Sequence, residues 1–110
     1  MANVRIVVTS VGLLGQAEQL ASALVERRLA ACVNIVGPTR SIYRWKDALQ
    51  SEQEYLLFIK TTAERAANLA ATFAELHPYE LPEQVELAVD GGSDAYLQWV
   101  SAQVDRDLNQ

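Results

Sequence analysis

The order in which two hydrophobic periods alternate along the chain constrains the fold more than any other feature. Stretches in which apolar side chains alternate or form short β-branched runs predict strands at residues 4–9, 31–45, 54–61 and 85–89. Apolar side chains three and four positions apart predict helices at residues 17–28, from Thr61 or Thr62 to Leu76, and after Ser93. The element order is therefore β-α-β-β-α-β, followed by a helix.

That order is the signature of the ferredoxin-like α+β fold, in which helices cover one face of an antiparallel sheet. The first strand is apolar on both faces, which predicts an internal position in the sheet. The 110 residues are close to the commonest domain size, and 50% of them are hydrophobic and 21% charged. No repeat or linker divides the chain, so we expect one domain over residues 1–110.

The predicted hairpin of residues 32–45 and 54–61 is unusually long. Its first arm of 14 residues would span about 45 Å at about 3.3 Å per residue, against about 18 Å for an ordinary strand. Gly37-Pro38 interrupts this arm and predicts a bend or bulge, and the polar residues 46–53 predict a turn region. An overhanging hairpin exposes strand edges that carry Ile42, Tyr43 and Trp45, and pairing with another copy would cover them. The sequence therefore predicts a homo-oligomer.

The charge and the cysteine content exclude several classes of function. Nine basic residues against 14 acidic ones give a net charge of −5 and a pI near 4.7. An acidic surface disfavours nucleic acid and anionic membranes as partners. A single cysteine allows no internal disulfide, and the N-terminal residues lack the pattern of a signal peptide. We expect a cytoplasmic protein with no membrane span.

The segment His77-Pro78-Tyr79-Glu80 is the most typical of a binding site. His77 is the only histidine and follows a helix, so we expect its ring to lie outside the core. It can serve as a metal ligand, a general base or a pH switch, or it can bond to the last carbonyls of the helix. The prolines stiffen the loop and preorganise Tyr79 and Glu80. A carboxylate near a histidine suits Cu²⁺ or Zn²⁺, with help from Glu54, Glu83 or a neighbouring subunit.

Other candidate residues have two interpretations each. Cys32 is either a reactive thiol or soft-metal ligand, or a small core residue, which its apolar neighbours favour. Gly91-Gly92-Ser93 is either an anion site at a helix N-terminus or a helix cap. Glu52 and Glu54 lie on the same face of a strand. No hydrolase, phosphate-loop, dinucleotide or zinc-protease motif occurs, so the sequence predicts a binding protein rather than an enzyme.

Five motifs resemble those of one known family. They are Arg28-Leu29-Ala30-Ala31-Cys32-Val33-Asn34, Ser41-Ile42-Tyr43-Arg44-Trp45, Ile59-Lys60-Thr61-Thr62, His77-Pro78-Tyr79-Glu80-Leu81-Pro82-Glu83 and Tyr96-Leu97-Gln98-Trp99. In this order, over residues 4–104, they resemble the CutA family, the divalent-cation tolerance proteins. The resemblance implies a ferredoxin-like domain assembled as a homotrimer, similar in architecture to PII signalling proteins. It also implies a role in tolerance of copper and other divalent cations.

The sequence departs from the family's bacterial copper pattern at two positions. That pattern has a cysteine at the end of the first strand and two adjacent histidines before Pro-Tyr, where this chain has Thr9 and Leu76 beside His77. A hydroxyl and a leucine cannot replace a thiolate and an imidazole as copper ligands. Cys32 and Glu54 match other positions of the pattern. The metal candidates are therefore His77, Glu54 and Cys32, for a weakly held copper or zinc ion.

Three hypotheses for the function follow. The first is a trimeric binding or sensing protein of the divalent-metal response. Its intersubunit cleft would be lined by His77, Tyr79, Glu80, Lys60 and Trp45. The second is a PII-like signalling module for a small metabolite or a partner protein, and the third is a stable trimeric scaffold without ligand chemistry.

Overall fold

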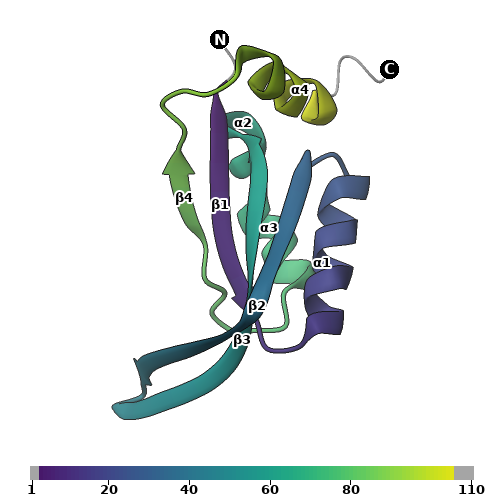
Figure 1. Ribbon diagram of the computed structural model, residues 1–110. Coiled ribbons are helices and arrows are strands. Elements are labelled where there is room, and N and C mark those ends of the chain that lie inside the picture. Colours follow the sequence, from purple (N-terminus) through teal and green to yellow (C-terminus); the bar gives the residue numbers. More distant parts are fainter. Residues whose placement is uncertain (1–2, 106–110) are drawn as a thin grey trace.

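The computed structural model describes residues 3–105, and the ends of the predicted domain, residues 1–2 and 106–110, lie outside that range. Four strands form one antiparallel sheet in the order β2-β3-β1-β4 (Figure 1). Their bounds are β1 Val4–Val11, β2 Cys32–Trp45, β3 Ala48–Thr62 and β4 Val85–Ala88. This is the predicted ferredoxin-like topology. The predicted internal position of the first strand is confirmed, because β1 lies between β3 and β4.

Within residues 3–105, helices cover only one face of this sheet (Figure 1). They are α1 Leu14–Glu26, α2 Ala63–Ala66 and α3 Leu69–Leu76, while α4 Asp94–Val104 lies at the end of the sheet away from the β2–β3 hairpin tip. The core between helices and sheet includes Val7, Leu24, Leu57, Ile59 and Phe73, each at most 2% exposed. Since side chains alternate along a strand, the neighbours of Val7 in β1 face the opposite, uncovered side.

The second predicted helix is two helices in the structure. The chain tightens between α2 and α3, where the Asn68 N–H donates to the Arg65 carbonyl three residues back, at 2.9 Å. Asn68 is a weak helix former, and the Arg65 guanidinium extends away to bond the Val104 carbonyl of α4 at 2.8 Å. The expectation of one continuous helix was therefore wrong at this point.

The predicted strand at residues 85–89 is confirmed as β4, Val85–Ala88, but the expectation that it is a core strand was wrong. β4 is a four-residue edge strand in which every residue is exposed. Val85 pairs with Val8, and Leu87 pairs with Ile6. Paired residues of an antiparallel ladder share a face, so both apolar side chains of β4 lie on the face that no helix covers. The alternation of apolar side chains correctly predicted a strand, but within residues 3–105 no helix packs on the sheet face that these side chains occupy.

The β2–β3 hairpin extends beyond the rest of the sheet as a two-stranded ribbon, which we call the arm, residues 39–54. β2 has the predicted 14 residues, and a register shift between Val36 and Thr39 confirms the bulge at Gly37-Pro38. The predicted turn region was too long, because β3 begins at Ala48 and only Lys46 and Asp47 form the turn. Both have positive φ, 49° and 64°, as a tight two-residue hairpin requires.

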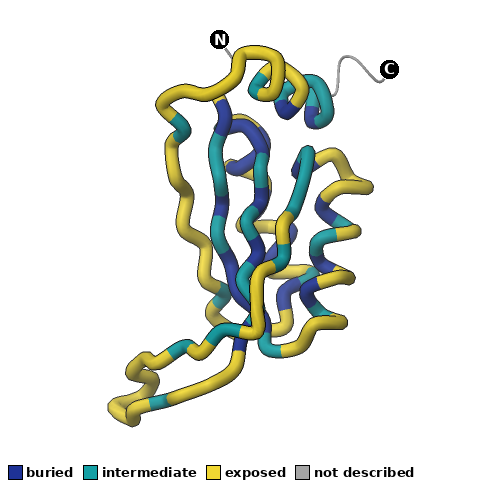
Figure 2. The backbone as a smooth tube through the Cα atoms, in the orientation of Figure 1, coloured by how far each residue is buried: buried dark blue, intermediate teal, exposed yellow. Residues whose placement is uncertain are grey.

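The arm makes the molecule elongated. Its longest dimension is 46 Å and its radius of gyration is 14.7 Å, against about 13 Å for a compact domain of 100 residues. Most of the arm is exposed (Figure 2). This exposure explains why the sequence did not predict the first part of β3, residues 48–53. Residues 48–53 pair only with β2 and bury neither face, so their sequence carries no alternation of polar and apolar side chains.

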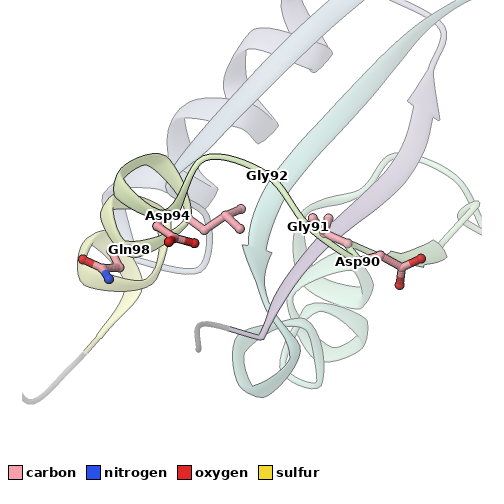
Figure 3. Close-up of a pocket in the computed structure, with 7 residues that line it drawn as sticks. Asp90, Gly91, Gly92, Asp94 and Gln98 are labelled. Carbon is pink, nitrogen blue, oxygen red and sulfur yellow. The ribbon is translucent and has the colours of Figure 1, made fainter.

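Ser93 caps α4 as predicted, because its hydroxyl accepts the Tyr96 N–H at 3.3 Å. A cavity of about 80 Å³ adjoins this cap (Figure 3). Asp90 and Asp94 contribute to its lining, with Gly91 and Gly92 between them. Two carboxylates disfavour an anion, so the cap interpretation of Gly91-Gly92-Ser93 fits better than the anion site. No helix in the described part of the chain is long and apolar enough to cross a membrane.

Candidate functional site

The arm and the loop after α3 enclose a groove of about 1020 Å³, which we call the arm groove. One wall comes from the two strands of the arm, and the other from the loop that contains the His77-Pro78-Tyr79-Glu80 segment. Its lining residues are Ser10, Ser41, Ile42, Tyr43, Trp45, Gln50, Glu52, Glu54, Pro78, Tyr79, Glu80, Leu81, Pro82 and Glu83. This volume is at the upper end of the range typical of small-molecule sites.

The arm groove brings together most of the predicted site residues. Trp45, Glu54, Tyr79 and Glu80 all line it, although they come from two strands and a loop. Gln50, Glu52 and Glu54 line it from alternate positions of β3, in agreement with the predicted shared face of the two glutamates. Tyr43 and Leu81 are lining residues that sequence reasoning did not single out for the site.

Lys60 and Cys32 lie elsewhere. They are paired across β2 and β3, six residues along β3 from Glu54, or about 20 Å at about 3.3 Å per residue. The Lys60 ammonium donates to the Asn34 side chain, and the Cys32 thiol lies 3.9 Å from the same oxygen. The expectation that Cys32 is a core residue was wrong, because Val33 packs on the core and Cys32 faces the uncovered side.

His77 is buried, with 8% of its surface exposed, so the expectation that its ring lies outside the core was wrong. The backbone at His77 is extended, φ −76° and ψ 136°, as a residue before proline prefers. Its ring packs between Phe73 and Tyr79, with ring centroids 5.5 and 5.1 Å away. Ending the helix here therefore places the ring against β1.

Both ring nitrogens of His77 have partners within the chain. Nε2 lies 3.0 Å from the Thr9 hydroxyl oxygen, and Nδ1 accepts the backbone N–H of Tyr79 at 3.1 Å. Burial lowers the pKa of His77, while the Ser10 backbone and the charge of Glu54 act in the opposite direction. A ring whose Nδ1 accepts an N–H is neutral, in agreement with the direction of this shift. Thr9, which the sequence marked only as a departure from the copper pattern, is its partner.

Tyr79 links the His77 ring to the arm. Its phenol donates a 2.7 Å hydrogen bond to the Glu54 carboxylate, which is only 7% exposed. Among the described residues no Lys or Arg forms an ion pair with Glu54. Burial raises the pKa of the Tyr79 phenol, and the hydrogen bond and charge of Glu54 raise it further. Residues 25 positions apart form this contact, and no local sequence signal points to it.

The arm groove is strongly acidic and partly aromatic. Four carboxylates line it, those of Glu52, Glu54, Glu80 and Glu83, and no Lys or Arg is among its lining residues. Burial and the nearby charge of Glu54 raise the pKa of Glu83. Burial, together with a hydrogen bond to Glu52, raises the pKa of Tyr43. Burial is the largest cause of both raised pKa values, and the nearby carboxylates add a negative field, which attracts cations.

The residues of a single chain do not fit the copper site that the family resemblance implies. Both His77 nitrogens are engaged, Leu76 packs against the core, and Cys32 is remote from Glu54. Within residues 3–105 no three His, Cys, Asp or Glu side chains lie close enough together to hold a metal ion. The assignment of Glu54 and Cys32 as metal ligands stays a prediction for the assembled protein, whereas that of His77 conflicts with the two hydrogen bonds of its ring.

A ferredoxin-like domain with an overhanging β2–β3 arm defines a recognisable class of small α+β proteins, and comparisons with known proteins identify the family within it. The model of the CutA1 divalent ion tolerance protein family matches residues 5–103. The chain therefore belongs to the CutA1 family. It is 48% identical over 84 residues to the divalent-cation tolerance protein CutA of Thermus thermophilus, covering 76% of this chain and 82% of that one.

Solved structures agree with this assignment. The crystal structure of CutA from Xylella fastidiosa is similar at a TM-score of 0.91 and 35% identity, covering 94% of this chain and 100% of that one. Some relatives are longer. The CutA homolog of Xenopus laevis is 43% identical over 84 residues, which cover 76% of this chain and only 56% of the frog protein. What those longer proteins do as a whole is therefore carried over only as a proposal.

Proposed function

We propose that this protein is a self-associating binding protein of the response to divalent cations, and that the arm groove is its ligand site. The observation that carries the proposal is the convergence of Trp45, Glu54, Tyr79 and Glu80 on one groove. A binding role is placed ahead of catalysis, because no nucleophile, base and orienting group can be named together in the described residues.

Self-association is supported by two uncovered surfaces. The sheet face opposite the helices exposes Val36, Val85 and Leu87, at 44–49%, and the arm exposes Ile42 and Leu49, at 67% and 73%. Exposed apolar side chains on an uncovered sheet face and on a projecting arm are typical of protein–protein contacts, and free strand edges along the arm invite pairing. We propose a homotrimer, as the family resemblance implies. Light scattering should give three times the chain mass of 12.1 kDa, and a monomer at micromolar concentration would contradict the assembly.

The chemistry of the arm groove favours a positively charged ligand. Four carboxylates supply the charge, and the aromatic side chains of Tyr43, Trp45 and Tyr79 line the same groove. The Lys46 ammonium lies 5.8 Å from the centre of the Trp45 ring, which shows that a cation can approach this lining. A copper or zinc ion is the first ligand to test, since the family links the protein to divalent cations. In a single chain the site would need further ligands from a neighbouring copy.

Isothermal calorimetry with Cu²⁺ and Zn²⁺, and a thermal-shift screen of organic cations, anions and nucleotides, test the groove as the site. Glu54→Gln keeps an acceptor for the Tyr79 phenol but removes the buried charge. Glu18→Gln, on the exposed face of α1, makes the same change of net charge away from the groove. Cations should raise the melting temperature of the wild type and of the Glu18 variant, and raise it less in the Glu54 variant. Equal responses in all three would overturn the groove as the ligand site.

A PII-like module for a small metabolite is the second candidate, and the groove volume supports it. Stabilisation by an organic anion or a nucleotide in the same screen would favour this candidate, although the acidic lining argues against it. A scaffold without ligand chemistry predicts no response to any compound. Named relatives include a chloroplastic protein of Arabidopsis thaliana and a periplasmic one of Archaeoglobus fulgidus. The compartment therefore varies among relatives, and cytoplasm is our proposal for this chain.

A further inference from the structure

The two hydrogen bonds of the His77 ring fix where its proton lies. The backbone N–H of Tyr79 is an obligate donor, so the Nδ1 atom that it contacts at 3.1 Å must be unprotonated. A neutral imidazole carries one proton, which therefore lies on Nε2. The Nε2–H group then donates to the Thr9 hydroxyl oxygen at 3.0 Å. The main chain thus selects one tautomer of this buried ring.

This tautomer closes the ring to metal ions. An imidazole binds a metal through a deprotonated nitrogen and carries its proton on the other nitrogen. A metal at Nε2 would place the proton on Nδ1, directly against the Tyr79 N–H, so that two donors would face each other. A metal at Nδ1 would displace the same N–H from its acceptor. Either arrangement leaves a partly buried backbone donor without its acceptor.

We infer that His77 is a positioning residue, a tautomer-locked clasp that fastens the loop after α3 to β1, and that in this chain it is not a metal ligand. Thr9 is the second half of the clasp, since its hydroxyl accepts the Nε2 proton. The inference goes beyond the proposed function and holds whichever ligand the arm groove takes.

The clasp determines where Tyr79 lies. The backbone of Tyr79 is held by Nδ1 of His77, its ring packs against the His77 ring, and its phenol bonds to Glu54. Gly12 follows β1 at this point, and a Cβ there would lie 3.4 Å from the Tyr79 phenol oxygen. The phenol therefore lies close to the backbone where β1 ends. Together these contacts hold the loop wall of the arm groove against the arm.

The disagreement with the copper pattern has a physical origin in these residues. A thiolate in place of Thr9 would supply a metal ligand, whereas the Thr9 hydroxyl supplies an acceptor for the imidazole proton. An imidazole in place of Leu76 would be a second ligand, whereas Leu76 packs against the core. The two differences from the copper pattern, at Thr9 and Leu76, therefore give His77 hydrogen-bond partners but, within residues 3–105, no further metal ligands beside it.

The first experiment observes the ring directly. Long-range ¹H–¹⁵N NMR spectra of the full-length wild type, which has one histidine, distinguish protonated from unprotonated ring nitrogens. We expect a protonated Nε2 and an unprotonated Nδ1 at pH 7.5, with both signals unchanged when Zn²⁺ is added. A protonated Nδ1, rapid exchange between tautomers, or a shift of the ring signals on addition of Zn²⁺ would overturn the inference.

Two variants separate the halves of the clasp. The side-chain amide of His77→Asn overlays Nδ1, so that it can accept the Tyr79 N–H. The amide of His77→Gln overlays Nε2, so that it can donate to Thr9. Hydrogen exchange of the Tyr79 amide should stay slow in H77N and become at least tenfold faster in H77Q, while the Cu²⁺ and Zn²⁺ affinities of both stay within twofold of the wild type. Equal exchange in the two variants, or a tenfold loss of metal affinity in both, would contradict the clasp.

Discussion

The two sides of Tyr79 differ in how their polar groups are satisfied. On the side of β1, His77 and Thr9 are buried and hydrogen-bonded to each other, and the Tyr79 N–H completes the set. On the side of the arm, four carboxylates line an open groove that no Lys or Arg lines. A closed and satisfied cluster stabilises the fold, whereas an open cluster of one charge costs stability. The comparison separates the part of the segment that holds the loop in place from the part that faces the proposed ligand site.

The largest effect should come from the packing beneath the closed side. Phe73 is 2% exposed and contacts the His77 ring, so Phe73→Ala should lower the free energy of unfolding by about 3–5 kcal/mol. Chemical denaturation at fixed protein concentration measures the change. Leu81→Ala, at a groove residue that is 69% exposed, should change stability by less than about 0.5 kcal/mol in the monomer. Similar losses in both variants would show that the two sides are not energetically distinct.

Removing the acceptor of the clasp should have the next largest effect. Thr9→Val keeps the shape of the side chain but leaves the Nε2–H of His77 without its partner, at a cost of about 1–3 kcal/mol. Thr9→Ser retains the hydroxyl and is the matched control, with a smaller loss from the missing methyl group. Denaturant unfolding of the three proteins tests this, and a valine variant as stable as the serine variant would contradict the hydrogen bond.

The fold could be predicted from the sequence further than the site could. The length of β2 and, apart from the division of the second helix, the element order follow from local periodicity and are confirmed. The burial of His77 could not be predicted, because it depends on Thr9, 68 residues away. The Tyr79–Glu54 bond is likewise a contact between distant segments. Residues 48–53 were missed because an exposed ribbon has no buried face to impose a pattern.

The next smaller effect should be a dependence of stability on pH that comes from His77. Burial lowers the pKa of His77 in the folded state, while in the unfolded chain it is about 6.5. As the pH falls below about 6.5, the unfolded state binds the proton first, so stability declines until the pH reaches the folded-state pKa and is independent of this group above pH 7. The pH profile of H77N should lack this decline. Glu83 also has a raised pKa and contributes to both profiles, so subtracting the H77N profile from that of the wild type isolates the contribution of His77. Parallel profiles from pH 5 to 8 would contradict the burial of a neutral ring.

The smallest effect should come from the open side. Glu52 is exposed in the arm groove, so Glu52→Gln should change stability by less than about 0.5 kcal/mol. It should nevertheless lower the pKa of Tyr43, because a hydrogen bond and the charge of Glu52 add to burial in raising it. Tyr79 should respond less, since burial and Glu54 dominate the raised pKa of its phenol. Ultraviolet titration of the phenolates, with Tyr43→Phe to assign the transitions, measures both. An unchanged Tyr43 transition would mean that the groove carboxylates act independently, and the acidic field that favours a cation would lose its support.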